Sequence, residues 1–171
     1  TTFTLPREQA AYGAVDAIAH LIESYFTTAD QAAEVTDEIV HALARSVIAA
    51  TERILKDPKD YDARASMMWS ATLALNGLIG AGVPQDWATH MIGHELTALY
   101  GIDHARTLAI VLPQVMQARR EAKREKLLQY AARVWQITEG SDDERIDAAI
   151  ARTAQFFESV GIPTRLSAYE L

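Results

Sequence analysis

The chain has 171 residues, a length that suits one domain with a sizeable core. Hydrophobic residues make up 49% of it and charged residues 23%, which is typical of a globular protein and not of a disordered or membrane-embedded one. The net charge of −7 disfavours a nucleic-acid partner, and the longest apolar run, residues 73–83, is interrupted too often to span a membrane. Cysteine is absent, which excludes disulfides and thiolate ligands, and we expect a cytoplasmic protein.

Apolar residues recur at spacings of three and four along nearly the whole chain, and no alternating stretch competes with them. We therefore predict an all-α fold, a bundle of about seven helices spanning residues 1–171 as one domain. Asp103 is expected to be an N-cap, and Ser141 and Glu144 have the spacing of a capping box. The expected helices begin after Pro6 and then cover residues 30–55, 61–78, 85–100, 103 onward, 121–138 and 141–160.

A glycine-rich segment, residues 77–82, separates the third expected helix from the fourth. A dinucleotide-binding fingerprint needs its glycines after a strand and before a helix, whereas these glycines follow a helix. We interpret the segment as a place where helices pack closely, and not as a phosphate loop.

Four of the five histidines fall into two groups. His90, His94 and His104 lie in one short segment, and His20 follows Asp16 by one helical turn. Neutral imidazoles with one carboxylate suit a divalent metal such as zinc or ferrous iron. The pattern therefore predicts a metal site, complete or in part.

Each group also has an ordinary structural explanation. Asp16 and His20 lie nearly opposite the apolar stripe of their helix, where a solvated ion pair is the alternative to a pair of ligands. The fourth expected helix is apolar on nearly all sides, so we predict that it is central and that His90 and His94 are buried. One buried histidine is usually bonded to a carbonyl, but three so close together favour a metal.

Two common metal motifs are absent. No second histidine follows His94 and Glu95 at the zincin spacing, and Glu38 with His41 forms a single Glu-x-x-His where a di-iron bundle needs two. We expect His41 to lie on the surface. Glu23 and Glu95 are candidates to support the ligands, although an exposed glutamate is the more ordinary outcome for each. The mixed basic and acidic run at residues 119–126 predicts a solvated helix face.

Several segments together resemble a known family. Residues 6–23, 93–98 (GHELTA) and 103–107 (DHART) resemble the signature segments of the iron-containing (group III) alcohol dehydrogenases. Residues 74–82 (ALNGLIGAG) and 137–144 (ITEGSDDE) look like the branch of NADPH-dependent butanol dehydrogenases and broad-range aldehyde reductases. The resemblance extends over essentially the whole chain.

The resemblance implies a C-terminal helical metal domain with Asp16, His20, His90 and His104 as protein ligands of zinc or iron. His94 would correspond to the active-site histidine beside the nicotinamide of NADP(H). The family's N-terminal Rossmann-like domain has no counterpart here, and the chain also looks C-terminally incomplete. In the full-length enzyme, which the resemblance suggests is a homodimer, the substrate would be a small aldehyde or alcohol.

The activity that follows is that of an NAD(P)-dependent alcohol dehydrogenase or aldehyde reductase, in which a divalent metal polarises the carbonyl for hydride transfer. We expect this part of the enzyme to be inactive alone. The alternatives are a helical metal-dependent phosphohydrolase, disfavoured because only the reversed dipeptide Asp103-His104 occurs, and a metal-free helical interaction module.

Overall fold

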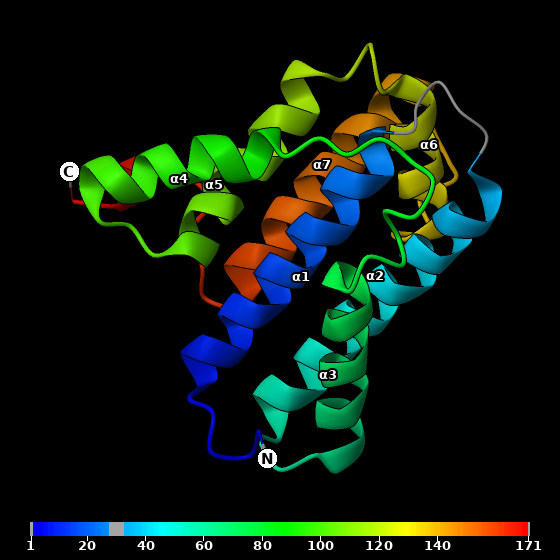
Figure 1. The fold of residues 1–171 in the computed structure, drawn as a ribbon. Coiled ribbons are helices and arrows are strands. Elements are labelled where there is room, and N and C mark those ends of the chain that lie inside the picture. The colour runs from blue at the N-terminus through cyan, green and yellow to red at the C-terminus, as the bar shows by residue number, and fades with distance from the viewer. Residues whose placement is uncertain (1, 28–32, 171) are drawn as a thin grey trace.

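The computed structural model describes residues 2–27 and 33–170. Within these ranges it contains seven α-helices, one short 3-10 helix and no strand, which confirms the all-α prediction (Figure 1). The elements are α1 (Arg7–Thr27), α2 (Glu34–Lys56), α3 (Tyr61–Leu75), α4 (Ala88–Tyr100), α5 (His104–Ala118), α6 (Arg124–Arg133), α7 (Asp142–Ser159) and η1 (Leu166–Ala168). None of the helices in the described part of the chain is both long and apolar enough to cross a membrane.

Helix α1 is the element around which the others assemble. It contacts α2, α3, α4, α5 and α6, and it runs through the middle of the molecule in Figure 1. Its apolar stripe, which includes Val15, Ile18 and Ile22, is fully buried in the main hydrophobic core. A helix that is packed on several sides in this way can present its remaining polar residues to a site at a fixed position.

Local signals place some of the helix ends. Asp60 caps α3 by accepting a hydrogen bond from the N–H of Ala63, and the predicted capping box of Ser141 and Glu144 opens α7. Helix α4 ends at Gly101, whose φ of 68° is in the left-handed region that glycine favours. The predicted helix over residues 121–138 is wrong at both ends, since α6 covers only Arg124–Arg133. The predicted start of α2 at residue 30 lies outside the described residues.

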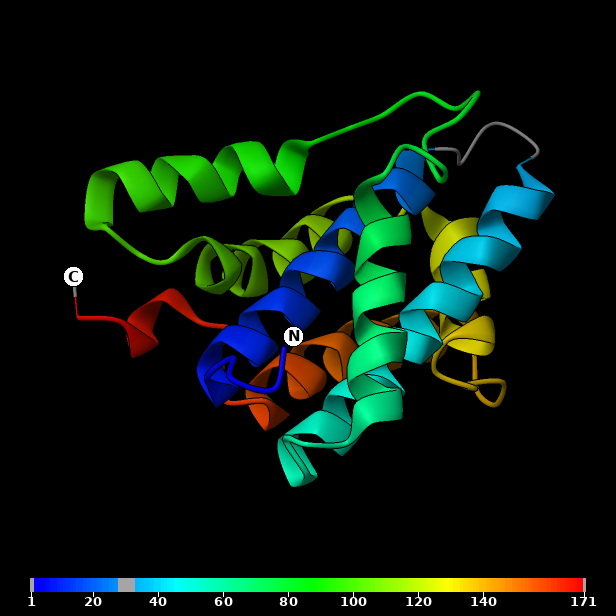
Figure 2. The ribbon, with the colours of Figure 1, turned by 60° about the horizontal axis from the view of Figure 1, so that its bottom comes forward.

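Helix α4 does not have the central position that its composition predicts. It packs mainly against α5, and Figure 2 shows its opposite side uncovered by any other helix. Met91, Ile92 and Leu99 are exposed on this helix, Leu99 to 70%. The prediction of a central helix was wrong because apolar composition shows that a surface needs a partner, and not that the partner belongs to the same chain.

Two predictions about single side chains are also wrong. His41 is not on the surface but 2% exposed, with its ring against Tyr25 at 5.0 Å between centroids. Burial lowers the pKa of His41, so this imidazole is neutral in the core. Lys126, predicted to lie on a solvated face, is buried and pairs with Asp37.

Close packing occurs at a different glycine from those predicted. A Cβ added at Gly77 or Gly82 would meet nothing within 4 Å, and both residues have a positive φ, so they make turns and do not form helix contacts. Gly80 is closely approached, but by the side chain of Gln85 in the same loop and not by another helix. Gly93, in the middle of α4, is buried, and an added Cβ would lie 2.8 Å from Oγ1 of Thr107 on α5. Gly93 therefore sets the close approach of α4 to α5.

We predict that Gly93→Ala destabilises the protein by about 1–3 kcal/mol, because the added methyl group forces α4 and α5 apart. Gly13→Ala is the matched control, since Gly13 is also helical and an added Cβ there meets nothing within 4 Å. It should stabilise by about 0.5–1 kcal/mol through the higher helix propensity of alanine. Urea unfolding measures both changes, and equal effects of the two substitutions would contradict the proposed close contact.

Candidate metal centre

Three helices bring a carboxylate and three imidazoles to one point. Oδ1 of Asp16 on α1 lies 3.5 Å from Nε2 of His20, 3.8 Å from Nε2 of His90 on α4 and 3.3 Å from Nε2 of His104 at the start of α5. One potential ligand atom from each of Asp16, His20 and His90 lies within 4.8 Å of the other two. His104 approaches Asp16 but lies outside this mutually close set of three.

The separations suit metal coordination better than hydrogen bonding. Ligand atoms bound at about 2.1 Å around a tetrahedral ion lie about 3.4 Å apart, which is close to the distances from Asp16. Oδ1 of Asp16 and Nε2 of His90 are both buried and have no hydrogen-bond partner among the described residues. Such unpaired groups destabilise a fold unless something binds them. The donor set therefore fits a divalent cation of the zinc or ferrous iron type.

The electrostatics of the cluster favour the ionised carboxylate. Burial opposes ionisation of Asp16, but the imidazoles of His20, His90 and His104 outweigh this and hold the pKa of its carboxyl well below the usual range. Burial, with the neighbouring imidazoles of His90 and His94, lowers the pKa of His104 even though Asp16 opposes this effect. An ionised carboxylate and a neutral imidazole are the forms that bind metals.

Glu23 supports the cluster through the second ring nitrogen of His90. Contrary to the expectation of an exposed side chain, it is 7% exposed and its Oε2 pairs with Nδ1 of His90. Burial lowers the pKa of His90, but the carboxylates of Asp16 and Glu23 outweigh it and raise this pKa to about 9. A carboxylate on Nδ1 leaves Nε2 directed at the other ligands, as in many metal sites.

The same carboxylate also caps the N-terminus of α4. Oε1 of Glu23 accepts hydrogen bonds from the backbone N–H groups of Thr89, at 2.6 Å, and His90, at 3.2 Å. Trp87, the N-cap residue of α4, provides no side-chain bond of its own. The free N–H groups of a helix start attract negative charge, so Glu23 fixes both the position of α4 and the orientation of its first histidine. The sequence signal for Glu23 is its place one turn after His20.

The other predicted site residues lie at the edge of the cluster. The prediction that His94 is buried is wrong: this residue, one turn after His90, is exposed. Its ring centroid is 5.3 Å from that of His104 and 6.3 Å from that of His90. It therefore borders the ligands without joining them. Glu95 is exposed, as expected.

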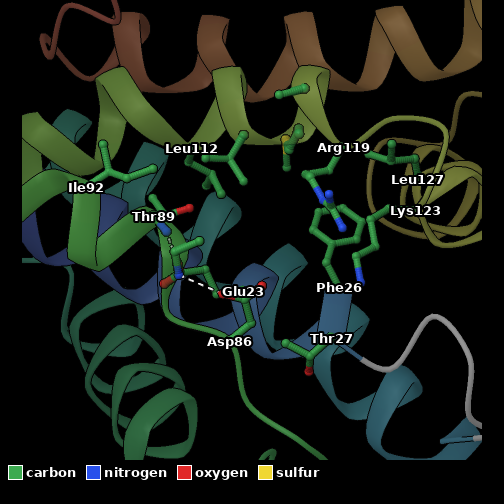
Figure 3. Close-up of a pocket in the computed structure, with 14 residues that line it drawn as sticks. Glu23, Phe26, Thr27, Asp86, Thr89, Ile92, Leu112, Arg119, Lys123 and Leu127 are labelled. Carbon is green, nitrogen blue, oxygen red and sulfur yellow. Dashed lines mark hydrogen bonds between the residues drawn. The ribbon is translucent and has the colours of Figure 1, made fainter.

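A pocket of about 390 Å³ lies on the other side of Glu23, between the end of α1, the start of α4 and the end of α5 (Figure 3). Its walls are largely apolar, and Figure 3 shows Arg119 and Lys123 beside Phe26 at one end. None of the four predicted ligands lines it. The histidines and this pocket are thus separate features, joined through Glu23.

The family model for the C-terminal part of the iron-containing alcohol dehydrogenases matches residues 10–171. The chain belongs to this family. It is 59% identical over 170 residues to the NADPH-dependent aldehyde reductase YqhD of Escherichia coli, covering 99% of this chain and 44% of that protein. It is 38% identical to NADH-dependent butanol dehydrogenase A of Clostridium acetobutylicum, covering 96% of this chain and 43% of that one.

Solved structures agree with this assignment. The substrate- and cofactor-free form of YqhD from E. coli superposes with a TM-score of 0.95 over 98% of this chain and 44% of that one. NADH-dependent butanol dehydrogenase A of Thermotoga maritima gives a TM-score of 0.91 at 40% identity, over 96% of this chain and 41% of that one. The chain thus spans less than half the length of these relatives. It has the fold of their helical C-terminal part, as the resemblance implied.

We predict that Glu23→Ala destabilises the protein by about 3 kcal/mol, because it leaves two backbone donors and one imidazole of α4 without their buried partner. Glu95→Ala is the control, since Glu95 is exposed on α4, and it should leave the free energy of unfolding nearly unchanged. Chemical denaturation of the metal-free chain measures both. Equal losses in the two variants would show that Glu23 is not the residue that fixes α4.

Proposed function

We propose that this chain is the metal-binding catalytic part of an alcohol dehydrogenase or aldehyde reductase, and that residues 1–171 form one domain of that enzyme. Asp16, His20, His90 and His104 hold one divalent ion, zinc or ferrous iron. The observation that carries the proposal is the convergence of three imidazole nitrogens on one buried carboxylate oxygen. The dehydrogenase and reductase names of the relatives support it and disfavour the phosphohydrolase and the metal-free module.

The bound ion would supply Lewis-acid polarisation of a carbonyl or hydroxyl oxygen. Among the chain's own residues, Glu23 keeps Nε2 of His90 directed at the ligand cluster through its contact with Nδ1. We propose that His94 lies beside the nicotinamide and relays the proton between the alcohol oxygen and solvent. Its exposed imidazole lies on the rim of the cluster and has one ring nitrogen that can accept a proton and one that can donate it.

Hydride transfer needs a nicotinamide, and we propose NADP(H) held by an N-terminal nucleotide-binding domain of the full-length enzyme. The uncovered apolar side of α4, where Met91 and Leu99 are exposed, is the surface on which we place the rest of that enzyme. Small aldehydes and alcohols are the proposed substrates, in keeping with the butanol dehydrogenase and aldehyde reductase names of the relatives.

We predict that the wild-type chain binds one equivalent of Zn²⁺ or Fe²⁺ and that the double variant Asp16→Ala, His104→Ala loses this binding. His94→Ala is the matched control, because it removes an adjacent histidine that we do not assign as a ligand, so its stoichiometry should stay at one. Elemental analysis after dialysis and calorimetric titration provide the measurement. A wild type that retains no more metal than the double variant would contradict the proposed function.

We also predict that the 171-residue chain alone does not oxidise NADPH with butanal, because a nucleotide site on a second domain is needed to hold the hydride donor. The same residues within the full-length enzyme should support turnover. Absorbance at the NADPH band follows both reactions. Appreciable turnover by the chain alone would show that its partner domain is dispensable.

A further inference from the structure

A polar network joins the first half of α1 to the first turn of α5. The hydroxyl of Tyr12 accepts a hydrogen bond from Nε of Arg106 at 2.5 Å, and Nη2 of Arg106 donates to Glu8 at 2.6 Å. The same hydroxyl lies 2.8 Å from Oε1 of Glu8 and 3.1 Å from Oδ2 of Asp103, so it donates to one of these two carboxylates. Two residues of α1 are thereby tied to two residues that flank His104.

Asp103 contributes to this network in place of its expected local role. It occupies the N-cap position of α5, where an aspartate usually accepts a hydrogen bond from its own helix, but its side chain makes no such bond. Its carboxylate faces α1, near Tyr12 and 3.5 Å from Nε of Arg106. The start of α5 is therefore held by contacts to α1 and not by its own cap.

These contacts lie one helical turn from the metal cluster. Tyr12 and Asp16 are four residues apart on α1 and so project from the same side, towards Asp103 with Arg106 and towards His104 respectively. His104 needs external support more than the other histidines do. Its side chain is 42% exposed, compared with 10% for His20 and 6% for His90, and among the described residues we find no hydrogen bond to its ring.

We propose that Tyr12 and Arg106 are positioning residues for metal binding, which hold the start of α5 so that His104 stays within reach of Asp16. This inference rests on the proposed function, since it requires that His104 is a ligand. Removing a residue that holds a metal ligand in place commonly weakens metal binding by about 10–100-fold. A surface ion pair with no such role contributes little beyond a small change in stability.

The test compares two arginines in matched surroundings. Arg106 and Arg124 each have a side chain that is 34% exposed and lies 2.6 Å from a carboxylate on another helix, Glu8 for the first and Asp143 for the second. We expect Arg106→Gln to weaken Zn²⁺ binding about tenfold in competition with a chromophoric chelator, and Arg124→Gln to change it less than twofold. The melting temperatures of the two metal-free variants should fall by similar small amounts.

Two further variants keep the test decisive if Arg106→Gln folds poorly. Tyr12→Phe keeps the ring and removes only the hydroxyl, and it should also weaken Zn²⁺ binding about tenfold. Arg106→Lys should recover only part of the affinity, because the ammonium group keeps the positive charge but lacks the planar fork of the guanidinium group. The visible absorption of bound Co²⁺, which reports coordination geometry, should change in Arg106→Gln and Tyr12→Phe but not in Arg124→Gln.

The outcomes separate this inference from the proposed function. A wild-type chain that binds neither Zn²⁺ nor Co²⁺ would contradict the proposed function itself. A wild type that binds both ions, with Arg106→Gln and Tyr12→Phe equal to Arg124→Gln in affinity and Co²⁺ spectrum, would overturn the positioning role alone.

Discussion

The rest of the site depends on the contacts that the carboxylate of Glu23 makes with the start of α4. This carboxylate accepts hydrogen bonds from two backbone N–H groups at the start of α4 and at the same time pairs with Nδ1 of His90. Helix α4 has few other contacts with α1, so this buried group determines where His90 lies relative to Asp16 and His20. One side chain thus couples the position of a helix to the geometry of a metal site, which explains why it is buried although it is charged.

The second constraint is that the site draws its ligands from three helices with different degrees of support. His20 and Asp16 share α1, which the core holds on several sides, whereas His104 begins α5 and is half exposed. Oδ1 of Asp16 and Nε2 of His90 are unfavourable without a cation, because both atoms are buried and have no hydrogen-bond partner among the described residues. The fold therefore holds these groups together through packing and through contacts outside the cluster, and a bound ion would then relieve the cost of bringing them together.

Much of this could be predicted from the sequence, and the exceptions have physical reasons. Helical periodicity and capping residues predict seven helices, and the grouping of four histidines with Asp16 predicts which side chains converge. The position of α4 could not be predicted, because its apolar side faces away from this chain. Nor could the burial of His41 and Glu23, since a polar residue is buried only when a partner from a distant segment covers it, and local periodicity contains no information about such partners.

The central claim is that one ion is held by Oδ1 of Asp16 and by Nε2 of His20, His90 and His104. X-ray absorption spectroscopy of the zinc-loaded chain tests it most directly, because it counts the light atoms around the metal and measures their distances. The account predicts a first shell of nitrogen and oxygen at about 2.0–2.2 Å, with the outer scattering of three imidazole rings. A shell with one imidazole or none would contradict it.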